Sequence, residues 1–419
     1  MGLFRRTKNN KKPVLTQIIE LIPNHILQSV VSRYQTDKHC SRYKTYDQLV
    51  ALMFGQLSKC STLEDISAGI GVSTTFIKDL GLRQSPARST MSDGNRKRNA
   101  EVFETLYYKL LAYYTRVLRV KHQAHIIEEV KHHTIKITDS TTVSLCLSLF
   151  DWAKFRTAKG GIKIHTTFDE SLMLPELVNI TEAKKHDRHG ISRAIFAPST
   201  IIIEDKGYFD FSLMSNRIKA DNWFVTRMKS NTTYEVLTTR PLPENTPDNI
   251  LSDEEIMLTG QAAFDGGMGD FALRKIVVYD QENDTQLAII TNNFSWSAET
   301  ISLLYKMRWD IEIFFKQLKQ HLKVKTFIGT SPNAVKSQIY VALICFLLLE
   351  LLRRNTCKAA HAFSNFTEKV RLSLCFYLSL DYVCNIICQG AKAIKKNPAP
   401  NLFSSQVRAQ TLIFNNLDP

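Results

Sequence analysis

The spacing of apolar and polar positions changes near residue 133. Before it, apolar residues recur every three or four positions, which predicts amphipathic helices over 14–82 and 101–120. Within the first range, 63–70 and 74–80 predict two helices joined by a short turn at Gly71-Val72-Ser73. This layout is consistent with a DNA-binding helix-turn-helix, and equally with a plain helical hairpin.

After residue 133 the pattern predicts strands, because short β-branched and apolar runs are separated by polar or glycine turns. Ile201-Ile202-Ile203 is apolar without alternation, as in a strand that is buried on both faces. Prolines, glycines and short alternating segments between 230 and 285 predict a β-rich insertion, whereas 298–323 and the stretch to about 389 predict helices. The expected strands are 134–139, 163–168, 176–181, 201–205, 223–227 and 287–291. We therefore expect an α/β fold preceded by an all-helical region.

Composition adds a polyanionic partner to this picture. The 419 residues include 54 Lys and Arg against 40 Asp and Glu, which leaves a net charge of +14. Excess positive charge attracts phosphates and steers association with nucleic acid. Apolar residues make up 44 % of the chain, which is typical of globular proteins, and the length predicts two or three domains.

Cysteine spacing and the longest apolar run exclude two other classes of protein. The eight cysteines form no C-x-x-C pair, so a zinc module is not expected, and scattered thiols favour a reducing cytoplasm. The run from Ile339 to Leu349 would span only about 16 Å as a helix, half of a bilayer core. We expect it to be a buried helix of a soluble protein without a membrane partner.

Three acidic residues stand out against this background. Asp139 and Asp205 are expected at the ends of two strands, where functional groups gather in sheets with crossover helices. Glu312 belongs to the expected helix over 298–323, in which five polar residues share a stripe about 80° wide: Tyr305, Arg308, Glu312, Lys316 and Lys319. Taken alone, the stripe is equally well explained by a solvent-exposed helix face with Glu312 paired to Lys316.

Converging carboxylates repel one another unless cations lie between them. Mg²⁺ prefers oxygen ligands, and two such ions can support both the attacking and the leaving oxygen in phosphoryl transfer. Arg308 and Lys319 would then hold the phosphodiester backbone, and Tyr305 would contact a phosphate or stack on a base. Glu204 competes with Asp205 as the second acid, because adjacent strand residues point to opposite faces of a sheet.

The same residues carry a family resemblance. Tyr305, Arg308, Glu312 and Lys319 follow the spacing Y-(2)-R-(3)-E-(6)-K, which resembles the signature of the IS4 family of bacterial DDE transposases. Asp205-Lys206-Gly207-Tyr208 resembles the D-x-G-Y segment of that family and favours Asp205 over Glu204. Thr138-Asp139-Ser140-Thr141 resembles the segment around its first acid, and the likeness covers roughly 130–350.

The resemblance implies an RNase H-like catalytic domain in which Asp139, Asp205 and Glu312 are catalytic metal ligands. It implies two Mg²⁺ ions, for which Mn²⁺ substitutes, and cleavage and strand transfer on double-stranded DNA. The DNA would be the terminal inverted repeats of the element and its target, bound by a homodimer in the bacterial cytoplasm at the nucleoid. Tyr305, Arg308, Lys316 and Lys319 would contact this DNA. A tryptophan is expected to stack on a flipped base, with Trp223 and Trp296 as equal candidates.

Two other functions stay open on the sequence alone: a nuclease of the same fold that cuts without joining, and a catalytically silent DNA-binding repressor. The presence of all three acids speaks against the repressor.

The expected division of the chain into domains is as follows: a basic arm at 1–13, a helical DNA-binding domain at 14–90, a basic connector and long helix at 91–128, the first catalytic part at 129–228, the β-rich insertion at 229–286, the second catalytic part with C-terminal helices at 287–390, and a tail at 391–419.

Overall fold

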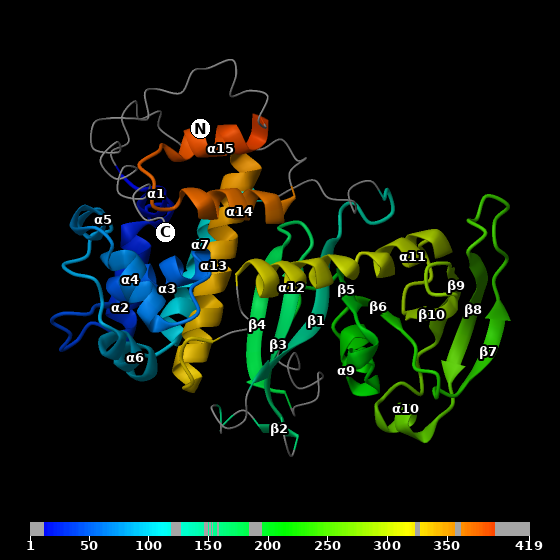
Figure 1. The fold of residues 1–419 in the computed structure, drawn as a ribbon. Helices are drawn as coiled ribbons and strands as arrows, with labels where there is room; N and C mark the ends of the chain where they lie inside the picture. The colour runs from blue at the N-terminus through cyan, green and yellow to red at the C-terminus, as the bar shows by residue number, and fades with distance from the viewer. Residues whose placement is uncertain are drawn as a thin grey trace, which may run out of the picture.

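The computed structural model describes residues 12–118, 127–145, 150, 152, 154–156, 159–183, 195–322, 327–356 and 362–389. Almost all of the expected N-terminal arm, and the whole C-terminal tail, lie outside these residues. Figure 1 shows two neighbouring parts, a helical part and a part built on one large sheet, with α11 and α12 running across the sheet toward the helices. The architecture is therefore mixed α/β with a helical N-terminal region.

The helical part combines both ends of the described chain. Between residues 12 and 118 the structure has seven helices: α1 (Val14–Ile19), α2 (Asn24–Tyr34), α3 (Thr45–Leu57), α4 (Leu63–Gly71), α5 (Thr74–Asp79), α6 (Arg88–Lys97) and α7 (Glu101–Leu118). Three of them, α3, α6 and α7, contact α13 (Pro332–Thr356), and α14 (Phe363–Ser373) and α15 (Leu380–Gln389) come after α13 in the sequence. The N-terminal helices thus share one core with the C-terminal helices.

Helix α13 is apolar on all sides because it lies inside this core. By length and composition it is the one helix of the described residues that could cross a membrane, but 94 % of its most apolar window is buried inside the protein. Tyr340 of α13 donates to the carbonyl of Val178 in the sheet (3.2 Å), and Tyr107 of α7 donates to that of Pro175 (2.6 Å). These buried hydroxyls fasten the helical part to the sheet.

The sheet of the described residues has ten strands in the order β2-β3-β1-β5-β6-β10-β9-β8-β7, with β4 paired to β3. β1, β5 and β6 are parallel to one another, whereas β3 and β4 are antiparallel additions on one side. The bounds are β1 (Thr134–Leu145), β2 (Lys154–Arg156), β3 (Lys159–Asp169), β4 (Leu174–Glu182), β5 (Thr200–Glu204), β6 (Trp223–Arg227), β7 (Tyr234–Thr239), β8 (Ile250–Leu258), β9 (Leu273–Asp280) and β10 (Thr285–Thr291).

The segment between 230 and 285 extends this sheet instead of forming a separate one. β10 pairs antiparallel with both β6 and β9, and β8 and β7 follow outward to the far edge. Two short helices, α9 (Phe211–Lys219) and α10 (Gln261–Asp265), pack together beside this part of the sheet. A second apolar core around Phe224, Ile256 and Leu273 holds them in place.

Two expected element bounds are wrong. β1 does not end at Asp139 but continues to Leu145, because β3 pairs with it along the whole of that length. The expected helix over 298–323 is divided into α11 (Ala298–Lys306) and α12 (Trp309–His321), with a turn at Met307-Arg308. Figure 1 shows the two helices following one another across the sheet.

Helix α11 begins in a network centred on the Glu129 carboxylate. That carboxylate accepts hydrogen bonds from the backbone N–H (3.0 and 3.1 Å) and the hydroxyl (2.9 Å) of Ser297, and from the Thr300 hydroxyl. The Ser297 hydroxyl in turn accepts from the backbone N–H of Thr300 (3.1 Å). A negative charge at a helix N-terminus also interacts favourably with the helix dipole. Glu129 therefore fixes the start of the helix that leads into Tyr305 and Arg308.

We expect Glu129→Ala to lower the free energy of unfolding by about 1–2 kcal/mol, the usual cost of losing a helix cap with charge-assisted bonds. Urea denaturation followed by circular dichroism measures this change. Glu128→Ala is the matched control, because Glu128 is exposed and pairs only with Lys131 among the described residues. Equal denaturation midpoints for the two variants would contradict the capping role.

Candidate active site

Asp139 and Asp205 lie side by side at the point where β5 stops. The parallel pairing of β1 with β5 ends at Thr138 and Glu204, so each aspartate is the next residue beyond the last pair. Asp139 Oδ1 accepts from the Ser140 backbone N–H (2.7 Å). Asp205 Oδ2 accepts from the Gly207 N–H (3.0 Å). Asp205 thereby caps η2 (Lys206–Tyr208), a 3₁₀ helix of one turn. The two strands thus deliver two carboxylates to the same edge, as expected, although only β5 ends there.

Glu312 reaches this edge because α12 buries its opposite face. The prediction of that apolar face is confirmed: its five members are all buried, namely Ile311, Phe314, Phe315, Leu318 and Leu322. Phe314 packs against Phe168 of β3 and Phe346 of α13, with ring centroids 5.6 and 5.1 Å apart. Successive side chains of an α-helix are rotated by about 100° about the helix axis. Because the apolar face of α12 is anchored in the core, Glu312 faces β1.

One guanidinium connects all three acids. Arg308 Nη1 lies 2.5 Å from Glu312 Oε1, 3.5 Å from Asp139 Oδ2 and 3.8 Å from Asp205 Oδ1. The expected convergence of residues 139, 205 and 312 is therefore present in the fold. Among the described residues, however, no three His, Cys, Asp or Glu side chains lie close enough together to hold a metal ion as they stand.

Burial and mutual repulsion shape the charge of this cluster. Burial, together with the charges of Asp205 and Glu312, raises the pKa of Asp139 to about 7. The Ser140 N–H and the Arg308 guanidinium act in the opposite direction, because each stabilises the charged carboxylate. The Ser140 N–H and the Arg308 guanidinium thus stabilise the negative charge of Asp139 against burial and the neighbouring acids.

Glu204, the competitor of Asp205, has a different partner. It is fully buried and accepts from Arg217 Nη2 (3.2 Å) of α9. Burial raises the pKa of the Glu204 carboxyl, while Arg217 lowers it. Arg217 lies outside the acid cluster, so the geometry assigns Glu204 to a structural ion pair and leaves Asp205 with Asp139.

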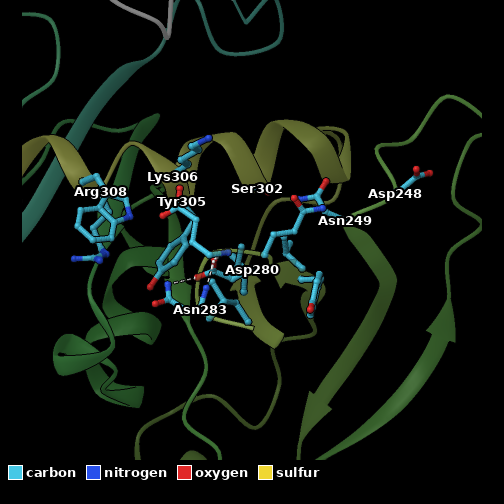
Figure 2. Close-up of a pocket in the computed structure, with 15 residues that line it drawn as sticks. Asp248, Asn249, Asp280, Asn283, Ser302, Tyr305, Lys306 and Arg308 are labelled. Atoms are coloured by element: carbon cyan, nitrogen blue, oxygen red, sulfur yellow. Dashed lines mark hydrogen bonds between the residues drawn. The ribbon is translucent and has the colours of Figure 1, made fainter. Parts of the chain in front are cut away.

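The cationic residues of the stripe line two cavities on either side of the acids. Lys316 and Lys319 line one of about 420 Å³ together with Asp139 and Glu312, and Lys319 donates to the Thr142 carbonyl (3.0 Å). Tyr305 and Arg308 line the other, of about 460 Å³. Figure 2 shows this second cavity between α11 and the β9–β10 turn, with Asp280 and Asn283 facing Tyr305. In the first cavity two lysines face two acids, and in the second Lys306 and Arg308 face Asp248, Asp280 and Glu282, so both linings carry charges of both signs.

Trp309 is a site residue that sequence reasoning did not single out. Its side chain is 54 % exposed, lines the second cavity and lies 5.8 Å from the Arg308 guanidinium carbon. Its position directly after Arg308 was the available signal. Trp223 and Trp296 instead pack edge-to-face with His133 and with each other, and Trp296 is only 6 % exposed. Packing thus removes Trp296 from the candidates for stacking on a base.

Comparison with known proteins gives the family. Residues 131–348 match the model of the transposase DDE domain, a domain that acts with divalent metal ions, and residues 10–83 match a domain of unknown function (DUF4372). A putative transposase, y4zB, of Sinorhizobium fredii is 31 % identical over 277 residues, which cover 64 % of this chain and 72 % of that protein.

Two further likenesses accompany these matches. A probable transposase for insertion sequence element IS5377 of Geobacillus stearothermophilus is 28 % identical over 249 residues, 59 % of this chain and 64 % of that protein, slightly under two thirds of its length. A solved structure of the piggyBac transposase synaptic complex with hairpin DNA aligns with a TM-score of 0.45 and 11 % identity over 96 % of this chain and 93 % of that one. The matched domain holds all three acids together with Arg308, and the chain belongs to the DDE transposases.

Proposed function

We propose that this transposase cuts DNA at the terminal inverted repeats of its own insertion sequence and joins the freed 3′ ends to target DNA. The observation that carries the proposal is the arrangement of Asp139, Asp205 and Glu312 around one guanidinium, from three elements far apart in sequence. The IS5377 relative, which is named a probable transposase for an insertion sequence element, supports the same substrate.

The strand order supports an RNase H-like catalytic core. β4, β3 and β1 form an antiparallel meander, and β5 and β6 continue the sheet parallel to β1. α12 covers β1 and brings the third acid. On this basis the catalytic domain consists of 129–228 and the second catalytic part within 287–390, which also contains the C-terminal helices, and 229–286 is inserted between the two parts. The Y-R-E-K spacing supports placing the chain in the IS4 family.

We propose Asp139, Asp205 and Glu312 as the ligands of two Mg²⁺ ions, with Mn²⁺ as a substitute. The donor set fits such hard cations, since it consists of carboxylate oxygens beside a hollow of about 420 Å³. When bound, the ions would activate the attacking oxygen and stabilise the leaving one. Arg308, Lys316 and Lys319 would hold the phosphates of the reacting strand, and Tyr305 would position its end.

The helical region supports a DNA-binding role for 14–90. α4 and α5 are joined by a short turn, and α5 has exposed Thr74, Thr75 and Lys78 along one side. α5 has only six residues, so its contact with a major groove would be short. Because two transposon ends must be brought together, we also propose that the protein acts as a homodimer. Its proposed location is the bacterial cytoplasm, at the nucleoid.

The decisive test supplies a pre-cut end with a free 3′ hydroxyl, a target plasmid and Mg²⁺ to the full-length protein. We expect joined products on a gel, because the proposed site performs transesterification as well as hydrolysis. Cleavage of end-containing DNA without any joined product would instead identify a nuclease. Binding of the DNA without either reaction would identify a silent repressor.

Trp309 offers a second test of DNA contact in the cavity of Figure 2. Exposed aromatic rings stack on bases, and removing one costs about 1–3 kcal/mol per base. We expect Trp309→Ala to weaken binding of end DNA by roughly tenfold or more, and Trp309→Phe to retain most of it. Fluorescence anisotropy on labelled DNA measures both. Equal affinity of the alanine variant and the wild type would exclude stacking at this position.

A further inference from the structure

Arg308 lies among the three acids that are proposed as metal ligands. Its Nη1 is the one cationic atom within 4 Å of all three carboxylates among the described residues. A guanidinium beside the three carboxylates competes with a divalent ion, because both cations are attracted to the same group of negatively charged oxygens. Metal binding at this site is therefore weakened as long as the arginine stays.

The surroundings of Arg308 give it a place to go. Its side chain lines the cavity shared with Tyr305 and Trp309, whose rings lie 5.9 and 5.8 Å from the guanidinium carbon. Its Nε is buried and has no hydrogen-bond partner among the described residues. Arginine binds phosphate in a forked geometry that uses two donors, and an unused Nε beside a hollow suits that purpose.

We propose that Arg308 is an exchangeable internal cation that holds Asp139, Asp205 and Glu312 together in the DNA-free protein. A DNA phosphate that binds Arg308 draws the guanidinium away from the carboxylates, and Asp139, Asp205 and Glu312 would then be available to hold divalent ions. DNA and metal then bind cooperatively, since each favours the same displaced position of one side chain. The inference rests on the proposed function, because it takes these acids as the metal ligands.

The test measures the affinity of full-length protein for Mn²⁺ from the EPR signal of the free ion. Without DNA, we expect Arg308→Gln to bind Mn²⁺ roughly tenfold more tightly than the wild type, because the competing cation is gone. A merely structural role of Arg308 predicts the opposite sign. With end DNA added and the binding of Mn²⁺ to DNA alone subtracted, the wild type should gain affinity by a similar factor, whereas Arg308→Gln should gain little.

Lys336→Gln is the matched control, since it removes the same charge from an exposed lysine of α13 that lines neither cavity. We expect it to change Mn²⁺ affinity by less than about threefold, because exposed charges are screened. Equal tightening by both glutamine variants, or none by Arg308→Gln, overturns the exchange.

If Arg308→Gln does not fold, the wild type decides alone: Mn²⁺ affinity that is unchanged by DNA overturns the proposal. A wild type that neither cuts nor joins end DNA overturns the proposed function instead, whatever its Mn²⁺ affinity. The two failures are therefore distinguishable.

Discussion

Glu312→Gln and Asp139→Asn should each reduce cleavage of end-containing DNA by about three powers of ten. Each variant keeps the shape of its side chain but replaces a carboxylate that we propose as a metal ligand by a neutral amide. Metal ions contribute several kcal/mol of transition-state stabilisation, and each 1.36 kcal/mol corresponds to a tenfold change in rate. Single-turnover cleavage with Mg²⁺ measures the loss, and a gel shift should show that DNA binding persists.

Glu299→Gln is the control for this experiment, because Glu299 is an exposed acid in the first turn of α11. It should cleave at the wild-type rate. Cleavage by Glu312→Gln within tenfold of the wild type would remove Glu312 from the catalytic site, and the same result for Asp139→Asn would remove Asp139.

Phe314→Ala should be the most destabilising single change in α12, lowering the free energy of unfolding by about 3–5 kcal/mol. The Phe314 side chain is 2 % exposed and contacts rings of both the sheet and α13. Removing the ring leaves a cavity. Because α12 is held by both the sheet and α13, it cannot move to fill that cavity. Guanidinium unfolding followed by circular dichroism gives the change.

Ile313 provides the neighbouring control, since its side chain is 50 % exposed on the other side of α12. Ile313→Ala should leave the unfolding midpoint almost unchanged. Similar losses for the two variants would mean that α12 is not anchored through the Phe314 face, and that this face does not turn Glu312 toward β1.

Helical spacing predicted the buried face of α12 because that pattern is a property of a local stretch. The same spacing ran through 298–323 without interruption and gave no sign of the turn at Met307-Arg308. Because of that turn, Tyr305 and Glu312 lie on different helices. The prediction of one continuous stripe from Tyr305 to Lys319 is therefore correct only in part. The acids could be placed because each followed an apolar strand, but not the extension of β1 to Leu145, which depends on β3.

The packing partners of segments far apart in the chain could not be predicted either, because they also depend on other elements of the fold. Nothing in the apolar run at 339–349 says which surface it covers, and the structure puts it against α3, α6 and α7. The positions of the tryptophans were equally hidden: residue type alone does not separate the packed Trp296 from the exposed Trp309. Periodicity reports how a segment is buried, whereas partners are set by the whole fold.

The place of α13 has a consequence for how the protein is made. On the ribosome, α3, α6 and α7 emerge first, and the segment that completes their core follows only after the entire sheet has been translated. At bacterial elongation rates that delay is roughly ten to forty seconds. During this interval the apolar surface of the nascent amino-terminal helices is not covered by α13. A protein truncated before α13 would keep that surface exposed, and we expect chaperones to bind it and proteases to degrade it.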